Sequence, residues 1–183
     1  MKKFIGILIL KFRGWQIDYP SNYKSSKCVM IAAPHTSIWD FIYSFAIFWE
    51  RDIKIKFLFD ANDKNKLILF LIKKIGGINI NEIEGSVVDY SVELLNKSDK
   101  IILIVPAEGT LKRVGKWRTG FYHIARKANV PVALGYLDYY DRTGGIGDLF
   151  RVSGNINNDF KKIQNFYKNF TAKVPENYNS IIY

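Results

Sequence analysis

Two short apolar runs, each ended by a proline, constrain the fold of this chain more than any other feature. Residues 27–33 (KCVMIAA) end at Pro34, and residues 100–105 (KIILIV) end at Pro106. Apolar runs of this length without polar alternation are typical of strands that are buried on both faces, which occur mainly in parallel sheets covered by helices. We therefore predict an α/β fold built on a largely parallel sheet.

The segments around these runs alternate between strand and helix patterns. With no repeat, low-complexity tract or long linker between them, we predict that residues 1–183 form a single α/β domain, a central sheet flanked by helices. Further strands are expected at residues 54–59, 78–80, 131–139 and 150–155. Helices are expected at residues 37–49, 63–75, 86–96, 119–129 and 159–170, with Ser86 as an N-cap and Gly76 and Gly77 as a C-cap.

The net charge of the chain limits the classes of molecule that we expect it to bind. The formal net charge is +10 and the pI about 9.6, with 48% hydrophobic residues and a mean hydropathy of −0.06. Nucleic acid, an anionic membrane surface and phosphorylated or acyl-carrier substrates all fit this excess, but no nucleic-acid-binding signature supports the first. A single cysteine, Cys28, excludes an intrachain disulfide, and two distant histidines make a metal site unexpected.

The N-terminal residues 1–16 contain an apolar stretch at residues 4–10, flanked by lysines and an arginine. The stretch is shorter than the roughly 20 residues that cross a bilayer. The pattern is typical of an interfacial helix, with its apolar side in the lipid boundary and its cations at the headgroups. A helix packed on the protein core explains it equally well.

A histidine and an aspartate follow the first apolar run. Residues 33–41 read APHTSIWDF, and His35 and Asp40 are too far round a helix to share a face. A contact requires His35 to precede the helix and Asp40 to reach back from its first turn. The carboxylate would then hold one imidazole nitrogen while the other takes a proton as a general base. Alternatively, residues 37–40 (SIWD) are a capping pattern, and Asp40 only caps the helix.

The second apolar run leads into residues 105–110 (VPAEGT). Because the carboxyl ends of neighbouring parallel strands meet at one sheet edge, where ligands bind, we expect Glu108 to lie near His35. A tight turn at Gly109 can direct backbone N–H groups at a developing oxyanion. The basic residues that follow either bind a phosphate group or form a solvated face; they are Lys112, Arg113, Lys116 and Arg118.

The segments PHTSIWD, PAEGT, KWRTGFYHIA and VPVALGYLDY together resemble the glycerolipid acyltransferase family, which includes the 1-acylglycerol-3-phosphate acyltransferases, over residues 28–139. The resemblance implies transfer of an acyl group from acyl-CoA, acyl-carrier protein or acyl phosphate to a lipid hydroxyl, without a cofactor or metal. It also implies a peripheral or monotopic enzyme at the cytoplasmic face of the cell membrane. By this resemblance His35 is the base, Asp40 its orienting carboxylate and Glu108 a third catalytic residue. The substrate-binding residues that it implies are Gly109 and Thr110, to which we add Lys112, Arg113 and Arg118 of the basic cluster.

The chain departs from the family pattern in the order of Pro106 and Ala107 before Glu108, and at two positions that commonly hold arginine. Glu82 stands where many members have a phosphate-binding arginine, and Leu111 replaces a second arginine. A phosphate at Glu82 would be repelled, so either Lys112 or Arg113 compensates or the acceptor is another hydroxylated lipid. The same losses leave open a catalytically inactive, lipid-binding protein of the same fold.

The remaining aromatic and histidine residues have simpler expectations. His123 is expected on a helix surface. The aromatic residues of the expected helix at residues 37–49 can pack the core, which we favour, or line an acyl tunnel; they are Trp39, Phe41, Phe45, Phe48 and Trp49.

Overall fold

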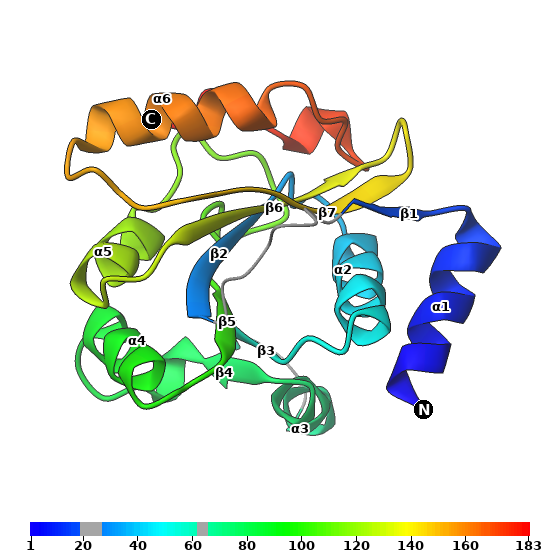
Figure 1. Ribbon diagram of the computed structural model, residues 1–183, viewed down its shortest axis with the longest axis horizontal. Coiled ribbons are helices and arrows are strands. Elements are labelled where there is room, and N and C mark those ends of the chain that lie inside the picture. Colours follow the sequence, from blue (N-terminus) through cyan, green and yellow to red (C-terminus); the bar gives the residue numbers. More distant parts are fainter. Residues whose placement is uncertain (19–26, 62–65) are drawn as a thin grey trace.

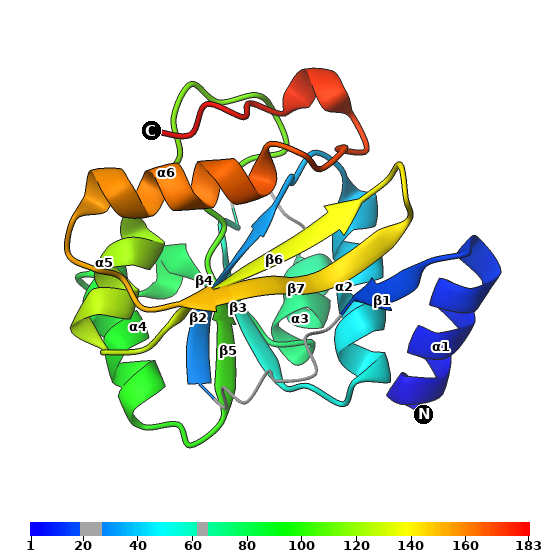
Figure 2. The same cartoon turned by 45° about the horizontal axis from the view of Figure 1, so that its top comes forward.

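A seven-stranded sheet forms the middle layer of the molecule. The computed structural model describes residues 1–18, 27–61 and 66–183. Its strands are β1 (Gln16–Asp18), β2 (Lys27–Ala33), β3 (Ile55–Phe59), β4 (Gly77–Asn79), β5 (Ile101–Ile104), β6 (Val132–Asp138) and β7 (Thr143–Phe150). They lie in the order β1-β7-β6-β2-β5-β3-β4 and twist across the molecule (Figure 2). Within the described residues only the β6–β7 pair is antiparallel, so the predicted α/β fold with a largely parallel sheet is confirmed.

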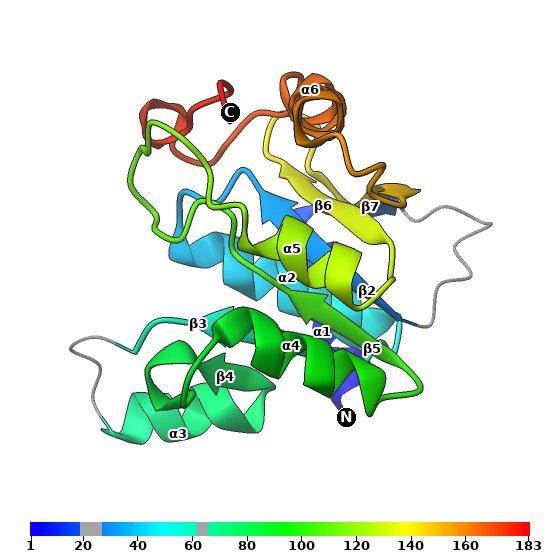
Figure 3. The same ribbon diagram turned by 90° about the vertical axis from the view of Figure 1, so that its left-hand side faces the viewer.

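Helices cover both faces of this sheet (Figures 1 and 3). Core contacts place the first three helices on one face and the last three on the other, where α4 and α5 lie side by side. None of the described helices is both long and apolar enough to cross a bilayer. The helices are α1 (Lys2–Arg13), α2 (Ile38–Glu50), α3 (Lys66–Lys74), α4 (Val87–Asn96), α5 (Gly120–Lys127) and α6 (Ile156–Tyr167), with short 3-10 turns η1 (Ile80–Glu82) and η2 (Pro175–Asn177).

The burial of the central strand β2 explains why its sequence is apolar after Lys27. Val29 and Ile31 are fully buried against the face covered by α4, α5 and α6, and Cys28 and Met30 are buried on the opposite face under α2. Strands β5 and β6 hydrogen-bond to its two edges. A strand enclosed in this way has no solvent-facing position for a polar side chain.

Helix α1 packs closely on α2. Leu10 is buried between the two helices, and a Cβ atom at Gly6 would lie 2.5 Å from the carbonyl oxygen of Ala46. Only a glycine permits such an approach of the two backbones. The opposite side of α1 carries exposed apolar side chains, among them Phe4 and Phe12. The N-terminal helix is therefore packed on the core along one side and apolar toward the solvent along the other.

The structure around β7 differs from the prediction. The strand expected at residues 150–155 is wrong: β7 ends at Phe150, and the residues after it lead into α6. The strand itself is rich in glycine, because a Cβ atom at Gly145 would lie 1.5 Å from the carbonyl oxygen of Asp18 on β1. Helix α6 begins three residues earlier than expected, with Asn155 as its N-cap. Residues 63–65 of the helix expected at 63–75 lie outside the described residues.

Candidate active site

The first sequence motif lies between the end of β2 and the start of α2. Ser37 is the N-cap of α2, and its hydroxyl accepts a hydrogen bond from Trp39 N at 3.3 Å. Asp40 Oδ2 in turn accepts from the backbone N–H groups of Thr36 and Ser37, at 2.7 and 2.9 Å. This reciprocal capping box begins the helix at Ile38, three residues after His35. Asp40 therefore does cap the helix.

The same carboxylate also contacts the histidine. His35 Nδ1 lies 3.3 Å from Asp40 Oδ2, and only 18% and 5% of the two side chains are exposed. The ring of Phe41 meets the imidazole edge to face, with the centroids 4.7 Å apart. Since Nδ1 faces the carboxylate, Nε2 is the nitrogen that remains for a substrate. The capping and orienting interpretations of Asp40 thus describe one geometry and do not exclude each other.

Tyr139 completes the hydrogen bonding of Asp40. Its hydroxyl donates to Asp40 Oδ1 at 2.5 Å, from the position directly after β6. Burial and the neighbouring carboxylate raise the pKa of Tyr139 well above its ordinary value, so the hydroxyl keeps its proton. Tyr139 was not among the site residues predicted from the sequence. Its place in the site could have been inferred, because β6 is a third predicted strand and its carboxyl end lies at the same sheet edge.

Glu108 joins the site through the backbone of the histidine. Its Oε2 accepts a hydrogen bond from His35 N at 2.7 Å, as the parallel pairing of β2 and β5 brings the two strand ends together. Burial, opposed in part by this hydrogen bond and assisted by the charge of Asp40, raises the pKa of Glu108 to about 8. The carboxyl group is therefore mostly protonated at neutral pH. The structure thus brings His35, Asp40 and Glu108 together at one edge of the sheet.

A large apolar groove opens beside these residues. It has a volume of about 670 Å³ and is lined by residues of α1, α2, α3, β3 and the turn after β5. Such a volume is within the range of ligand sites. His35 and the residues of the turn, Pro106, Gly109, Thr110 and Leu111, are among those that line it. Apart from Asp60, the other lining side chains are apolar; they are Ile9, Ile38, Phe41, Ile42, Phe45, Trp49, Phe57, Leu58, Phe59, Ile72 and Ile75.

The aromatic residues of α2 divide between the core and this groove. Phe48 is buried under the helix, Phe45 is buried and also lines the groove, and Phe41 and Trp49 line it. Trp39 is 40% exposed and lies under the guanidinium of Arg13. The favoured expectation of core packing thus holds for part of the set only.

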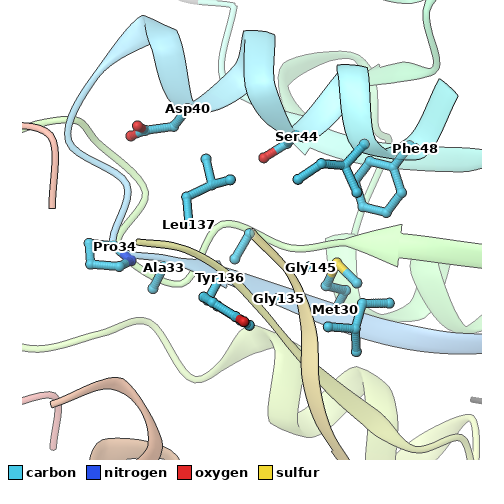
Figure 4. A pocket seen from close by; sticks show the side chains of 13 residues that line it. Met30, Ala33, Pro34, Asp40, Ser44, Phe48, Gly135, Tyr136, Leu137 and Gly145 are labelled. Carbon is cyan, nitrogen blue, oxygen red and sulfur yellow. The ribbon is translucent and has the colours of Figure 1, made fainter. Parts of the chain in front are cut away.

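A second cavity under α2 is too small for a lipid (Figure 4). Asp40, Ser44 and Phe48 project into it from α2, toward Met30 and Leu137 on the sheet. Its volume of about 30 Å³ suits one or two water molecules. The groove is therefore the space in which a long apolar substrate fits.

The basic residues after the second motif lie in different surroundings. A Cβ atom at Gly109 would lie 2.9 Å from Cζ of Arg118, so this guanidinium packs directly on the turn that borders the groove. Arg113 Nη1 instead donates to the carbonyl oxygen of Tyr178 at 2.9 Å. Lys112 and Lys116 are exposed. Of the predicted basic residues, Arg118 is the one whose side chain contacts the turn.

Glu82 and Leu111, which stand where the family commonly has arginines, have different surroundings. Glu82 forms an exposed ion pair with Lys73 at 2.6 Å, and its hydrogen bond with Lys73 is the main cause that lowers the pKa of Glu82. Leu111 lines the groove. His123 is exposed on α5, as expected. Among the described residues, no group of three or more histidine, cysteine, aspartate or glutamate side chains is arranged to hold a metal ion.

Comparison with known proteins gives a consistent result. A solved structure of similar fold is the 1-acyl-sn-glycerophosphate (LPA) acyltransferase PlsC from Thermotoga maritima, with a TM-score of 0.59 and 14% sequence identity, covering 94% of this chain and 80% of that chain. No curated protein matches the sequence significantly. The profile of the acyltransferase family matches residues 16–133, a segment that contains both motifs. The resemblance found in the sequence is thereby confirmed, and the chain belongs to the acyltransferase family.

Proposed function

We propose that this protein transfers an acyl group from an activated donor to a hydroxyl of a lipid acceptor, with His35 as the general base. The observation that carries the proposal is the position of His35, which contacts Asp40 and lines an apolar groove of about 670 Å³. A base in the wall of such a groove suits a substrate with a reactive polar group and a long apolar chain. The donor is a thioester of CoA or acyl-carrier protein, or an acyl phosphate.

The mechanism follows from the two nitrogens of His35. Asp40 Oδ2 holds Nδ1, so Nε2 takes the proton of the acceptor hydroxyl as its oxygen attacks the acyl carbonyl carbon. The tetrahedral intermediate then collapses, the bond to the leaving group breaks, and Nε2 returns the proton to the departing thiolate or phosphate. No covalent acyl-enzyme and no cofactor are needed.

The turn after β5 supports the same step. Gly109 and Thr110 line the groove next to His35, and backbone N–H groups of such a turn can stabilise the oxyanion of the intermediate. Glu108 holds the backbone of His35 in place through its 2.7 Å hydrogen bond. Arg118, which packs on Gly109, is the best-placed cation for a phosphate of the donor or acceptor. Lys112 and Arg113 follow the same turn and contribute to the positive potential around it.

We propose further that the enzyme works at an anionic membrane face, with α1 as its interfacial helix. The exposed side of α1 carries Phe4, Leu8 and Phe12, which are 64%, 51% and 87% exposed, while its other side packs on α2. Lysines near an anionic surface each contribute about 1 kcal/mol to membrane binding. With a net charge of +10, the chain as a whole favours the cytoplasmic leaflet, where anionic lipids are found.

The proposal is tested by replacing His35. The variant His35→Ala should lose acyl transfer by at least about 100-fold, because a positioned general base contributes this much or more. The matched control is His123→Ala, which removes the exposed histidine of α5. Release of free thiol from acyl thioesters is measured with a panel of lipid acceptors, and circular dichroism checks the fold of both variants. Retained activity in His35→Ala would falsify the assigned base.

The alternative is a lipid-binding protein of this fold without turnover. It is favoured by Glu82, which pairs with Lys73 at a position where the family commonly has an arginine, and by the apolar Leu111. This alternative predicts that the wild-type protein binds lipid and releases no leaving group from any donor. The arrangement of His35, Asp40 and Glu108 argues against it, because lipid binding alone needs none of their contacts.

A further inference from the structure

Helix α3 is apolar on the side that it turns to the solvent. It lies against β4 at the edge of the sheet, and none of its nine residues is buried. Ile68, Phe70 and Leu71 are 50%, 53% and 53% exposed. On the opposite side, Leu69 and Ile72 pack partly against the phenylalanines of β3. A helix at a water-facing surface normally carries polar residues on its outer side, so α3 lacks the pattern of a solvent-exposed helix.

The exposed side of α3 continues an apolar surface around the groove. Ile72 of α3, Ile38 and Ile42 of α2 and Ile9 of α1 all line the groove. Ile38 is 61% exposed and Ile42 is 37% exposed. Together with the outer sides of α1 and α3, these side chains form an apolar rim, which we define as the exposed apolar residues of α1, α2 and α3. Helices α1 and α3 stand on either side of α2 (Figure 1).

The charges on α3 indicate what covers this rim. The helix reads KLILFLIKK and has no acidic residue; of its three lysines, Lys73 pairs with Glu82, and Lys66 and Lys74 are exposed. Lys74 Nζ lies 4.5 Å from the ring centroid of Phe70, so the ammonium group sits beside the apolar side chain rather than apart from it. Lysines with this arrangement can place their stems along apolar side chains and their ammonium groups at lipid phosphates. A second copy of the chain, by contrast, would bring the same lysines and the same net charge of +10 against this face.

We propose that α3 is a second membrane-contacting helix, which together with α1 seats the apolar rim in an anionic lipid bilayer. The groove then opens toward the acyl chains between two inserted helices. The next step rests on the proposed function: the acceptor lipid reaches His35 from within the bilayer, without passing through water.

The test compares two double variants of the full chain. Phe70→Ser/Leu71→Ser removes two apolar side chains of the rim that do not line the groove, and Tyr90→Ser/Ile181→Ser removes two others, 39% and 64% exposed, from outside the rim. Binding is measured by sedimentation with vesicles of phosphatidylcholine containing about 30% phosphatidylglycerol. We expect the α3 variant to bind about tenfold more weakly, since binding scales with inserted apolar area, and the control variant to bind as the wild type does. Equal binding of the α3 variant and the wild type overturns the proposal.

Two further measurements separate the possible outcomes. Acyl transfer between short-chain, detergent-dispersed substrates should be unchanged in the α3 variant, because the groove and His35 are intact. If the wild type shows no transfer but the α3 variant still loses vesicle binding, the proposed function fails and the membrane role of α3 stands. Sedimentation velocity without lipid should give the same monomer for both proteins. A wild-type dimer that the α3 variant abolishes would assign the rim to a second copy and overturn the lipid assignment.

Discussion

The hydroxyl of Tyr139 donates to Asp40 Oδ1 at 2.5 Å, while the other oxygen of the same carboxylate faces Nδ1 of His35 at 3.3 Å. Asp40 is therefore held from both sides, by a residue that follows β6 and by the residues that precede α2. Its carboxylate cannot rotate without breaking one of these contacts. The orientation of the imidazole thus depends on a tyrosine that is 99 residues from Asp40 in the sequence.

The first prediction concerns this tyrosine. Tyr139→Phe keeps the ring but removes the donor, which leaves one oxygen of a buried carboxylate without that hydrogen bond. We expect kcat to fall about tenfold, because a hydrogen bond to a charged group contributes roughly 1.5–3 kcal/mol. Tyr140→Phe, at the neighbouring position and 82% exposed, is the control. Steady-state kinetics of the two variants decides: an unchanged kcat in Tyr139→Phe would show that Asp40 does not need this contact.

The second prediction concerns the pH dependence of stability. The pKa of Glu108 is raised by burial from 4.5 in the unfolded chain to about 8 in the folded protein. The folded state therefore binds the proton more tightly, and the free energy of unfolding should fall as the pH rises from about 5 to 8 and level off above that. Glu108→Gln, which cannot ionise, should flatten this part of the profile.

Denaturant unfolding at a series of pH values measures this effect. The exposed Glu176→Gln is the matched control, and its profile should keep the slope of the wild type. The prediction is contradicted when the slopes of wild type and Glu108→Gln agree.

The third prediction concerns the turn beneath Arg118. Gly109 has a φ angle of +69°, and an added Cβ atom would lie 2.9 Å from Cζ and Nε of Arg118. Gly109→Ala should lower the free energy of unfolding by roughly 1–2 kcal/mol, the cost of a left-handed alanine, and displace the guanidinium. Gly115→Ala is the control, since nothing lies within 4 Å of its Cβ position. Thermal unfolding and the KM of an anionic donor are measured; equal stability of both variants would refute this reading of the turn.

The fourth prediction concerns the acceptor and rests on the proposed function. Leu111 lines the groove where family members commonly have an arginine. Leu111→Arg should lower the KM of a phosphate-bearing acceptor about tenfold, the effect of one charge-assisted hydrogen bond, and leave that of a neutral lipid alcohol unchanged. Leu111→Gln, polar but uncharged, controls for the loss of the leucine. A uniform change for both acceptors would mean that no phosphate binds near this position.

Much of the site could be predicted from the sequence because it depends on strand ends. The apolar runs that became β2 and β5 are unmistakable, and parallel neighbours bring their carboxyl ends together, so His35 and Glu108 were expected to meet. Local capping chemistry likewise predicted the starts of α2 at Ser37 and α4 at Ser86. These features follow from short-range rules that a sequence displays directly.

The parts that were missed depend on contacts between distant segments. Gly144 and Gly145 lay in no predicted strand, yet they belong to β7, where Leu137 and Asp18 approach too closely for any side chain. Apart from its place after β6, Tyr139 carries no signal of its role in its own segment, since its partner Asp40 lies on α2. The apolar groove is formed by three helices, strand β3 and a turn, and no single segment of the sequence encodes it.

The tight contact at Gly6 has one more consequence. The backbones of α1 and α2 are in close contact at Ala46, so we expect a displacement of α1 to move the helix that carries Asp40 as well. On the proposed bilayer, the depth to which α1 sinks would set the height of the imidazole above the acyl chains. The absence of a side chain at Gly6, far from the reacting atoms, would thus help to set the position of the active site relative to the membrane.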